Sequence, residues 1–113
     1  MEITRGDNKT IKFQRKSKDG SIITTIPTEI YFTVKKDYSY TDFLIQKKLS
    51  DGGISFNTDD NFYRFEITPK DTNDLSFGEY VYDIEKTENG KVLTISKGKL
   101  IITEESTHST NKE

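Results

Sequence analysis

The chain has 113 residues, the usual size of a single domain, and its 17 Lys and Arg residues against 19 Asp and Glu residues give a formal net charge of −2. So small a net charge offers no basic footprint for nucleic acid or for an anionic membrane surface, and we expect neither as a partner. The absence of Cys excludes a disulfide framework, a thiolate metal site and a Cys nucleophile. The first residues lack the apolar run of a signal peptide, and no window approaches the roughly 20 apolar residues of a membrane span, which predicts a protein made and folded in a cytoplasm.

Alternating apolar and polar side chains between clusters of turn-forming residues predict β-strands from the start of the chain. A short strand begins at Ile3 and ends at a Gly-Asp-Asn turn. A second strand spans Thr10 to Arg15, and Ile22 to Pro27 reads as a connecting segment because Pro cannot donate to a strand ladder. Strict alternation over Glu29 to Lys35 predicts the third strand, with every second residue pointing inward.

The middle of the chain continues this pattern. The polar segment from Lys36 to Thr41 predicts a loop, and Phe43 to Lys48 predicts a strand. Ile54 to Phe56 and Tyr63 to Ile67 flank a Thr-Asp-Asp-Asn turn and predict a hairpin. Asp71 to Asp74 can form one helical turn, capped by Asp or Thr.

The stretch from Leu75 to Ile84 predicts the corner around which the fold is organised. Leu75 is apolar, Gly78 permits a turn, and Tyr80 begins an inward stripe on the strand that runs to about Thr87. In immunoglobulin-like sandwiches a Tyr at the start of this strand folds back and donates its hydroxyl to upstream backbone. We therefore expect Tyr80 to bond the backbone between Pro69 and Leu75.

The last strands follow a strong hairpin signal. Asn89-Gly90 favours a two-residue turn, so the strand from Lys91 to Ile95 should pair antiparallel with its predecessor. Gly98 indicates a bulge before the apolar run from Leu100 to Thr103. The polar residues from Glu104 to Glu113 read as a solvated tail.

Seven or eight short strands predict an all-β fold, an immunoglobulin-like antiparallel Greek-key β-sandwich with a tyrosine corner, over residues 1–103, followed by the polar tail 104–113. Its expected inward stripes are Ile11/Phe13, Ile30/Phe32/Val34, Tyr63/Phe65/Ile67 and Tyr80/Tyr82/Ile84.

Chemical motifs are sparse in the sequence. His108 is the only His and lies in the polar tail, without a nucleophile or a metal ligand beside it in sequence. The acidic pairs Asp59/Asp60 and Asp71/Asp74 could hold calcium, but Asp is also a natural turn and cap residue, and the spacing of a calcium-binding loop is missing. These observations predict a protein that is not an enzyme, with no cofactor and no metal site.

Among the aromatic residues outside the inward stripes, four are candidates for an interaction surface: Tyr31, Tyr38, Tyr40 and Phe62. Exposed Tyr and Phe are enriched where proteins meet, and Tyr is also an ordinary residue of strand surfaces, so both interpretations stay open. Ile101 adds to this candidate interaction surface, because one strand face can bury only alternate members of Leu100-Ile101-Ile102. Its cover is either a partner subunit, the tail from Glu104, or the connection from Ile22 to Pro27.

Five features carry a family resemblance, and in chain order they are Ile3-Thr-Arg-Gly-Asp7, Phe32-Thr-Val-Lys-Lys36, Ile67-Thr-Pro-Lys-Asp-Thr72, Leu75-Ser-Phe-Gly-Glu-Tyr-Val-Tyr-Asp-Ile84 and Gly98. This ordered set resembles small phage and prophage proteins of Gram-positive bacteria, similar to the immunoglobulin-like N-terminal domain of baseplate upper proteins. The long C-terminal extensions of full baseplate proteins are not part of this chain.

The resemblance implies a non-enzymatic structural or assembly protein of a phage tail or baseplate. Its partners would be other phage structural proteins or further copies of itself. It would be located in the bacterial host cytoplasm during assembly, and then in the virion tail. A carbohydrate-binding module is the alternative, in which Tyr31, Tyr38 and Tyr40 would stack on sugar rings.

Overall fold

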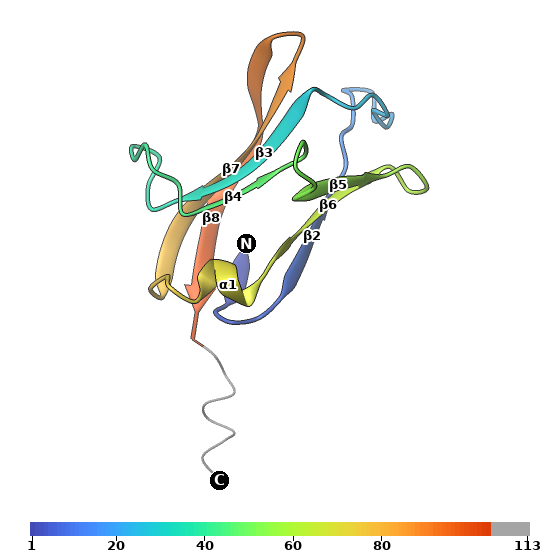
Figure 1. Ribbon diagram of the computed structural model, residues 1–113. Coiled ribbons are helices and arrows are strands. Elements are labelled where there is room, and N and C mark those ends of the chain that lie inside the picture. The colour runs from blue at the N-terminus through green and yellow to red at the C-terminus, as the bar shows by residue number, and fades with distance from the viewer. Residues whose placement is uncertain (105–113) are drawn as a thin grey trace.

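The computed structural model describes residues 1–104, which form two β-sheets packed face to face with one short helix at an end of the sandwich (Figure 1). The five-stranded sheet has the order β1 (Glu2–Thr4), β8 (Lys91–Thr103), β7 (Gly78–Glu88), β3 (Glu29–Lys35) and β4 (Ile45–Lys48). The three-stranded sheet has the order β2 (Lys9–Phe13), β6 (Phe62–Ile67) and β5 (Ile54–Asn57). Helix α1 (Pro69–Thr72) connects the two sheets between β6 and β7.

The strand order confirms the predicted all-β sandwich. The neighbours β8, β7 and β3 correspond to strands G, F and C of an immunoglobulin-like fold, and β2, β6 and β5 to strands B, E and D, so the chain changes sheet in a Greek-key manner. One pairing departs from the antiparallel prediction. Strand β1 runs parallel to β8, with Ile3 opposite Ile102.

The predicted inward stripes form the core. Phe32 is fully buried, and its ring lies 4.4 Å from that of Phe65 and 5.8 Å from that of Tyr82. Phe13 stacks on Tyr63 at 5.1 Å, but Phe13 and Ile11 are only partly buried because β2 is an edge strand. Aromatic contacts therefore fill the space between the sheets of this cysteine-free chain, each worth about 0.5–1.5 kcal/mol beyond its buried area.

The tyrosine corner forms one residue later than predicted. The hydroxyl of buried Tyr80 donates to the Ser76 carbonyl at 2.7 Å, outside the expected range from Pro69 to Leu75. The carbonyl of Leu75 already accepts a hydrogen bond from Arg5 Nη1 at 3.3 Å. Arg5 and Tyr80 thus bond two successive carbonyls of the corner.

The helical turn lies earlier than predicted, at Pro69–Thr72 instead of Asp71 to Asp74. Proline favours the first turn of a helix because its missing N–H has no intrahelical partner there. The carboxylate of Asp71 accepts a hydrogen bond from the backbone N–H of Thr68 at 2.8 Å. The N-cap is therefore Thr68, one of the two predicted residue types, and Asp71 completes a capping box from the third helical position.

The predicted bulge at Gly98 is wrong. The register of β7 and β8 shifts between Ile84 and Glu85, which leaves Ile95 as the extra residue. Gly98 instead lies opposite Tyr82, where a Cβ atom would be 3.2 Å from the Tyr82 ring. The glycine accommodates an aromatic ring and does not bend the strand.

Two predicted strands are also shorter than expected. The strand predicted over Thr10 to Arg15 is β2, which ends at Phe13, and the one predicted from Phe43 begins only at Ile45.

Candidate interaction surface

Three of the segments that carry the family resemblance meet at the corner beside α1: the start of the chain, the helical turn and the stretch from Leu75. The guanidinium of Arg5 lies 4.3 Å from the centre of the Phe77 ring, in addition to its bond to Leu75. The backbone N–H of Gly6 donates to Thr72 Oγ1 at 3.1 Å, and Thr72 is fully buried. These residues tie the start of the chain to the corner, so their role in the structure is to hold the sandwich closed.

An ion pair joins this corner to the edge of the five-stranded sheet. Lys47 Nζ on β4 lies 2.8 Å from Asp71 Oδ2. Burial raises the pKa of the Asp71 carboxyl, but the Lys47 ammonium and the Thr68 N–H outweigh this, so the net effect is a pKa below the usual value. Within residues 1–104, the Asp71 carboxylate therefore stabilises the fold by joining α1 to β4.

The residues of the predicted interaction surface do not form one patch. Tyr31 lies on the outer face of β3, and Tyr38 and Tyr40 lie in the connection between β3 and β4. Phe62 belongs to β6 of the other sheet, where the Lys12 ammonium lies 4.9 Å from its ring centre. Ile101 lies on the outer face of β8, since Leu100 and Ile102 on either side of it are buried.

Tyr38 lies back on the sheet. Its hydroxyl is 3.2 Å from the Tyr82 carbonyl and 3.1 Å from the Gly98 carbonyl, which are partners across β7 and β8. The Lys97 ammonium stands 5.6 Å from the centre of its ring. Tyr38 thus anchors the connection after β3 to the outer face, while about half of its surface remains exposed.

Ile101 is half-buried and has a neighbour that the sequence did not suggest. Strand β1 covers the edge of β8 beside it, where the Ile101 N–H donates to the Met1 carbonyl at 2.9 Å. Glu2 and Glu79 lie opposite Ile101 on the two flanking strands. The connection from Ile22 to Pro27, one expected cover, is instead near the hairpin tip, and the tail lies outside the described residues beyond Glu104.

Two further apolar residues are exposed in the connection between β3 and β4. Phe43 and Leu44 were expected to begin a strand, but they precede it, and both are exposed, as are Tyr38 and Tyr40. The signal in the sequence was present: Phe43, Leu44 and Ile45 are consecutive, and a strand face can bury only alternate members of such a run.

The tip of the β7–β8 hairpin is the second exposed apolar region, and sequence reasoning missed it. Figure 1 shows that this hairpin projects beyond the rest of the sandwich. Val92 and Leu93 are 62% and 60% exposed, and Ile95 at the bulge is 37% exposed. Three apolar side chains within four residues on an uncovered hairpin are unusual for a solvated surface. We call residues Glu85 to Ser96 the hairpin arm.

A buried arginine contacts the hairpin arm beside its turn. Arg15 is only 6% exposed, and its guanidinium donates to the Thr25 carbonyl at 3.0 Å and approaches Glu88 Oε1 at 3.5 Å. Lys86 Nζ also bonds Glu88, at 2.8 Å, and this hydrogen bond is the main reason that the pKa of Glu88 is below its ordinary value. A hollow of about 350 Å³ lies between this cluster and the apolar side chains of Leu93 and Ile95.

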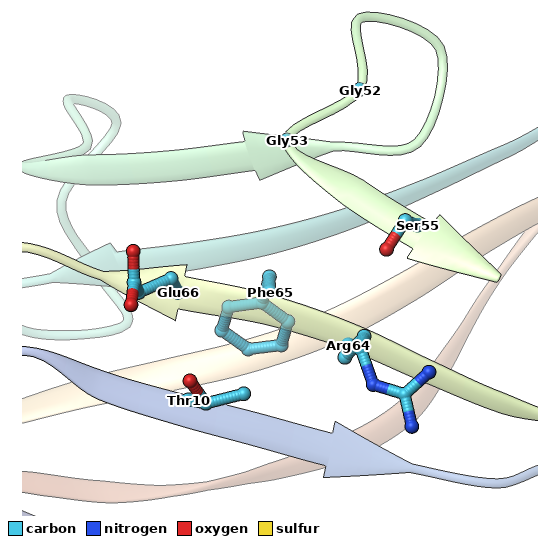
Figure 2. A pocket seen from close by; sticks show the side chains of 7 residues that line it. All are labelled: Thr10, Gly52, Gly53, Ser55, Arg64, Phe65 and Glu66. Carbon is cyan, nitrogen blue, oxygen red and sulfur yellow. The ribbon is translucent and has the colours of Figure 1, made fainter. Parts of the chain in front are cut away.

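Another hollow, of about 260 Å³, lies over the three-stranded sheet (Figure 2). Its lining residues come from β2, β5, β6 and the turn before β5: Thr10, Gly52, Gly53, Ser55, Arg64, Phe65 and Glu66. The Arg64 guanidinium is held by Asp60 Oδ2 at 2.7 Å. The volume is below the range of roughly 300–1,000 Å³ that is typical of small-molecule sites.

Within the part of the chain that the structure describes, no group of three or more His, Cys, Asp and Glu side chains is placed to hold a metal ion. Over the same residues, no helix has the length and apolar character needed to cross a bilayer. No protein-family model matches the chain, and no curated protein gives a significant match to it.

Proposed function

We propose that this chain is a non-enzymatic structural module that acts through protein–protein contacts in the assembly of a phage or prophage tail or baseplate. The observation that carries the proposal is the exposure of apolar side chains on two projecting parts of a firmly closed sandwich. In the connection between β3 and β4, Tyr40 and Phe43 are each 54% exposed. Aromatic side chains of this kind are enriched at the centres of protein interfaces.

The phage context of the proposal rests on the resemblance to baseplate upper proteins. Three of the resembling segments meet at the corner, where the Leu75 carbonyl accepts from Arg5 and the Leu75 N–H donates to the Thr72 carbonyl. The module's site of action would be the host cytoplasm during assembly and the virion tail afterwards.

The geometry disfavours the carbohydrate-binding alternative. Sugar rings stack on open aromatic faces, but the Lys48 ammonium lies 5.9 Å from the Tyr31 ring centre and the Lys97 ammonium 5.6 Å from that of Tyr38. The Tyr38 hydroxyl is also engaged with two carbonyls. Of the three predicted sugar-stacking residues, only Tyr40 has no lysine over its ring and no hydrogen bond to its hydroxyl within residues 1–104.

Co-expression with the products of neighbouring genes, followed by affinity capture and mass spectrometry, tests the proposal. We expect phage tail or baseplate proteins to be retained by the wild type and lost with the double variant Tyr40→Ser and Phe43→Ser. Phe62→Ser, on the other sheet, is the matched control and should retain them. Equal capture by the wild type, the double variant and Phe62→Ser would contradict the proposal. Specific binding on a glycan array would also contradict it.

A further inference from the structure

Strand β8 has an open edge over more than half of its length. On one side it pairs with β7 from Lys91 to Ile102, whereas on the other side β1 pairs only with Ile101 to Thr103. Among residues 1–104, no strand lies along the outer edge of β8 from Lys91 to Gly98. Such an edge presents a row of unpaired N–H and C=O groups to solvent.

The direction of these backbone groups follows from the hairpin turn. Asn89 and Gly90 have φ angles of 55° and 77°, which is typical of the two-residue turn that is closed by a hydrogen-bonded pair, here Glu88 and Lys91. Hydrogen-bonded and non-hydrogen-bonded pairs then alternate, so Thr87 and Val92 form a non-hydrogen-bonded pair.

The contact between Thr28 and Thr87 agrees with this alternation. The Thr87 carbonyl points away from β8 and accepts the Thr28 N–H at 2.9 Å. On the opposite strand, Val92 and Thr94 therefore direct their N–H and C=O groups to the open edge.

The usual protections of an edge strand are weak here. The segment from Lys91 to Gly98 contains no Pro, and its lysines, Lys91 and Lys97, stand only at its ends. Its one bulge, at Ile95, lies beyond Val92 to Thr94 and leaves that part of the edge regular. Between them the exposed side chains are largely apolar, with Val92 on the outer face and Leu93 on the inner face. A strand added at this edge would cover apolar surface on both faces.

We propose that the hairpin arm is a self-association site, at which a second copy of this chain adds its own β8 antiparallel, with Leu93 opposite Leu93 of that copy. The inference rests on the proposed function and specifies one of its contacts. In this register Val92 of each copy exchanges two backbone hydrogen bonds with Thr94 of the other. A twofold axis perpendicular to the joined sheets relates the copies, so the contact closes on itself.

The bulge at Ile95 selects this register from its neighbours. Centring the pair on Thr94 would require Val92 to pair with Ser96 of the second copy, beyond the extra residue Ile95. Centring it on Val92 would require Thr94 to pair with Gly90 in the second copy's turn. Centring it on Leu93 uses only the regular residues Val92 to Thr94.

The free length of the edge also fits a second copy. The turn of the second copy reaches the level of the bulge, before Lys99, whose carbonyl accepts a hydrogen bond from the Met1 amino group, and before Ile101, where β1 begins. Because the arms project from their sandwiches (Figure 1) and run in opposite directions, the two bodies lie at opposite ends of the joined arms. The pairing therefore uses the part of the edge that the chain itself leaves open.

Cysteine cross-linking tests the register, because the chain contains no other Cys. Leu93→Cys places two thiols at a non-hydrogen-bonded pair, where Cα atoms are about 4.5 Å apart, within the range that a disulfide spans. In the matched variant Val92→Cys the two thiols lie on diagonally adjacent residues of the paired strands. Their Cα atoms are then farther apart than the roughly 7 Å that a disulfide can span. We expect mild oxidation at 50 to 100 μM, a range where weak dimers are populated, to produce a covalent dimer of Leu93→Cys and little of Val92→Cys.

Sedimentation velocity tests the backbone pairing. Val92→Pro removes an N–H that points to the open edge and leaves the β7 ladder intact, while Val92→Thr keeps that N–H and the branched shape. By symmetry the proline removes two hydrogen bonds, so the dimer dissociation constant should rise roughly tenfold or more, with Val92→Thr close to wild type. Circular dichroism establishes that both variants fold.

Two results would overturn the inference. One is a wild type that stays monomeric up to about 200 μM, a concentration at which contacts of even modest affinity are populated. The other is equal cross-linking of the two Cys variants. If either result is found and tail proteins are still captured, the self-association site is wrong and the proposed assembly function stands. If the dimer forms but no tail protein is captured, the assembly function fails instead.

Discussion

The tyrosine corner offers the sharpest test of how this sandwich is closed. Tyr80→Phe deletes one hydroxyl that donates to the Ser76 carbonyl at 2.7 Å and leaves the buried ring in place. Ser76 itself is exposed, so water can reach its carbonyl once the hydroxyl is gone. The expected loss is therefore the net value of a hydrogen bond, about 0.5–1.5 kcal/mol, and not the larger penalty of an orphaned buried group.

Urea unfolding, followed by tyrosine fluorescence and circular dichroism, measures this loss. A change of 1 kcal/mol in the free energy of unfolding should lower the melting temperature by about 4–8 °C in a domain of this size. Tyr40→Phe is the matched control, because Tyr40 is exposed and its hydroxyl has no partner within residues 1–104. If the two variants unfold at the same urea concentration, the Tyr80 hydroxyl does not hold the corner.

Three further predictions concern other contacts of the fold. Gly98→Ala should lower the free energy of unfolding by about 1–3 kcal/mol, because its Cβ would lie 3.2 Å from the Tyr82 ring, and the loss should shrink when Tyr82→Leu is added. Arg15→Met should cost about 0.5–1.5 kcal/mol in urea unfolding, the net value of a hydrogen bond, because it removes the donor to the Thr25 carbonyl while Glu88 keeps its bond to Lys86. The pKa of the Asp71 carboxyl is lower in the folded state than in the unfolded state. Its contribution to stability is therefore fully present above the unfolded-state pKa of about 4 and is lost as the pH falls through the folded-state pKa. Asp71→Asn should therefore flatten the pH dependence of the melting temperature below pH 4, and an unchanged slope would show that the ion pair with Lys47 contributes nothing.

The strand pattern of the sequence predicts the core well because it depends on local alternation. Strand β3 occupies the predicted residues Glu29–Lys35, and its inward residues Phe32 and Val34 are fully buried. A strict period of two specifies both the strand and its buried face, whatever the neighbouring strands are.

Features that depend on distant contacts could not be predicted in the same way. The Tyr80 hydroxyl bonds Ser76, one residue beyond the predicted range, in a corner that Arg5, 70 positions away from Leu75, also bonds. Gly98 reads locally as a bulge, but its role is set by the Tyr82 ring across the strand pair. The exposure of Leu93 depends on where the opposite sheet ends, which no property of the hairpin sequence records.

The parallel pair of β1 and β8 also has a kinetic consequence. Its three residue pairs join positions 2–4 to positions 101–103, so this contact closes a loop of nearly the whole sandwich. Contacts of such long sequence separation form late, since their loop-closure entropy is repaid only after the rest has folded. On a ribosome, β1 has to wait for the last strand to emerge. The buried side chain of Ile3 and the bonds of Arg5 and Gly6 to the corner hold β1 on the sheet. Detachment of β1 would extend the uncovered edge of β8 to Thr103, so these contacts limit how much edge a partner meets.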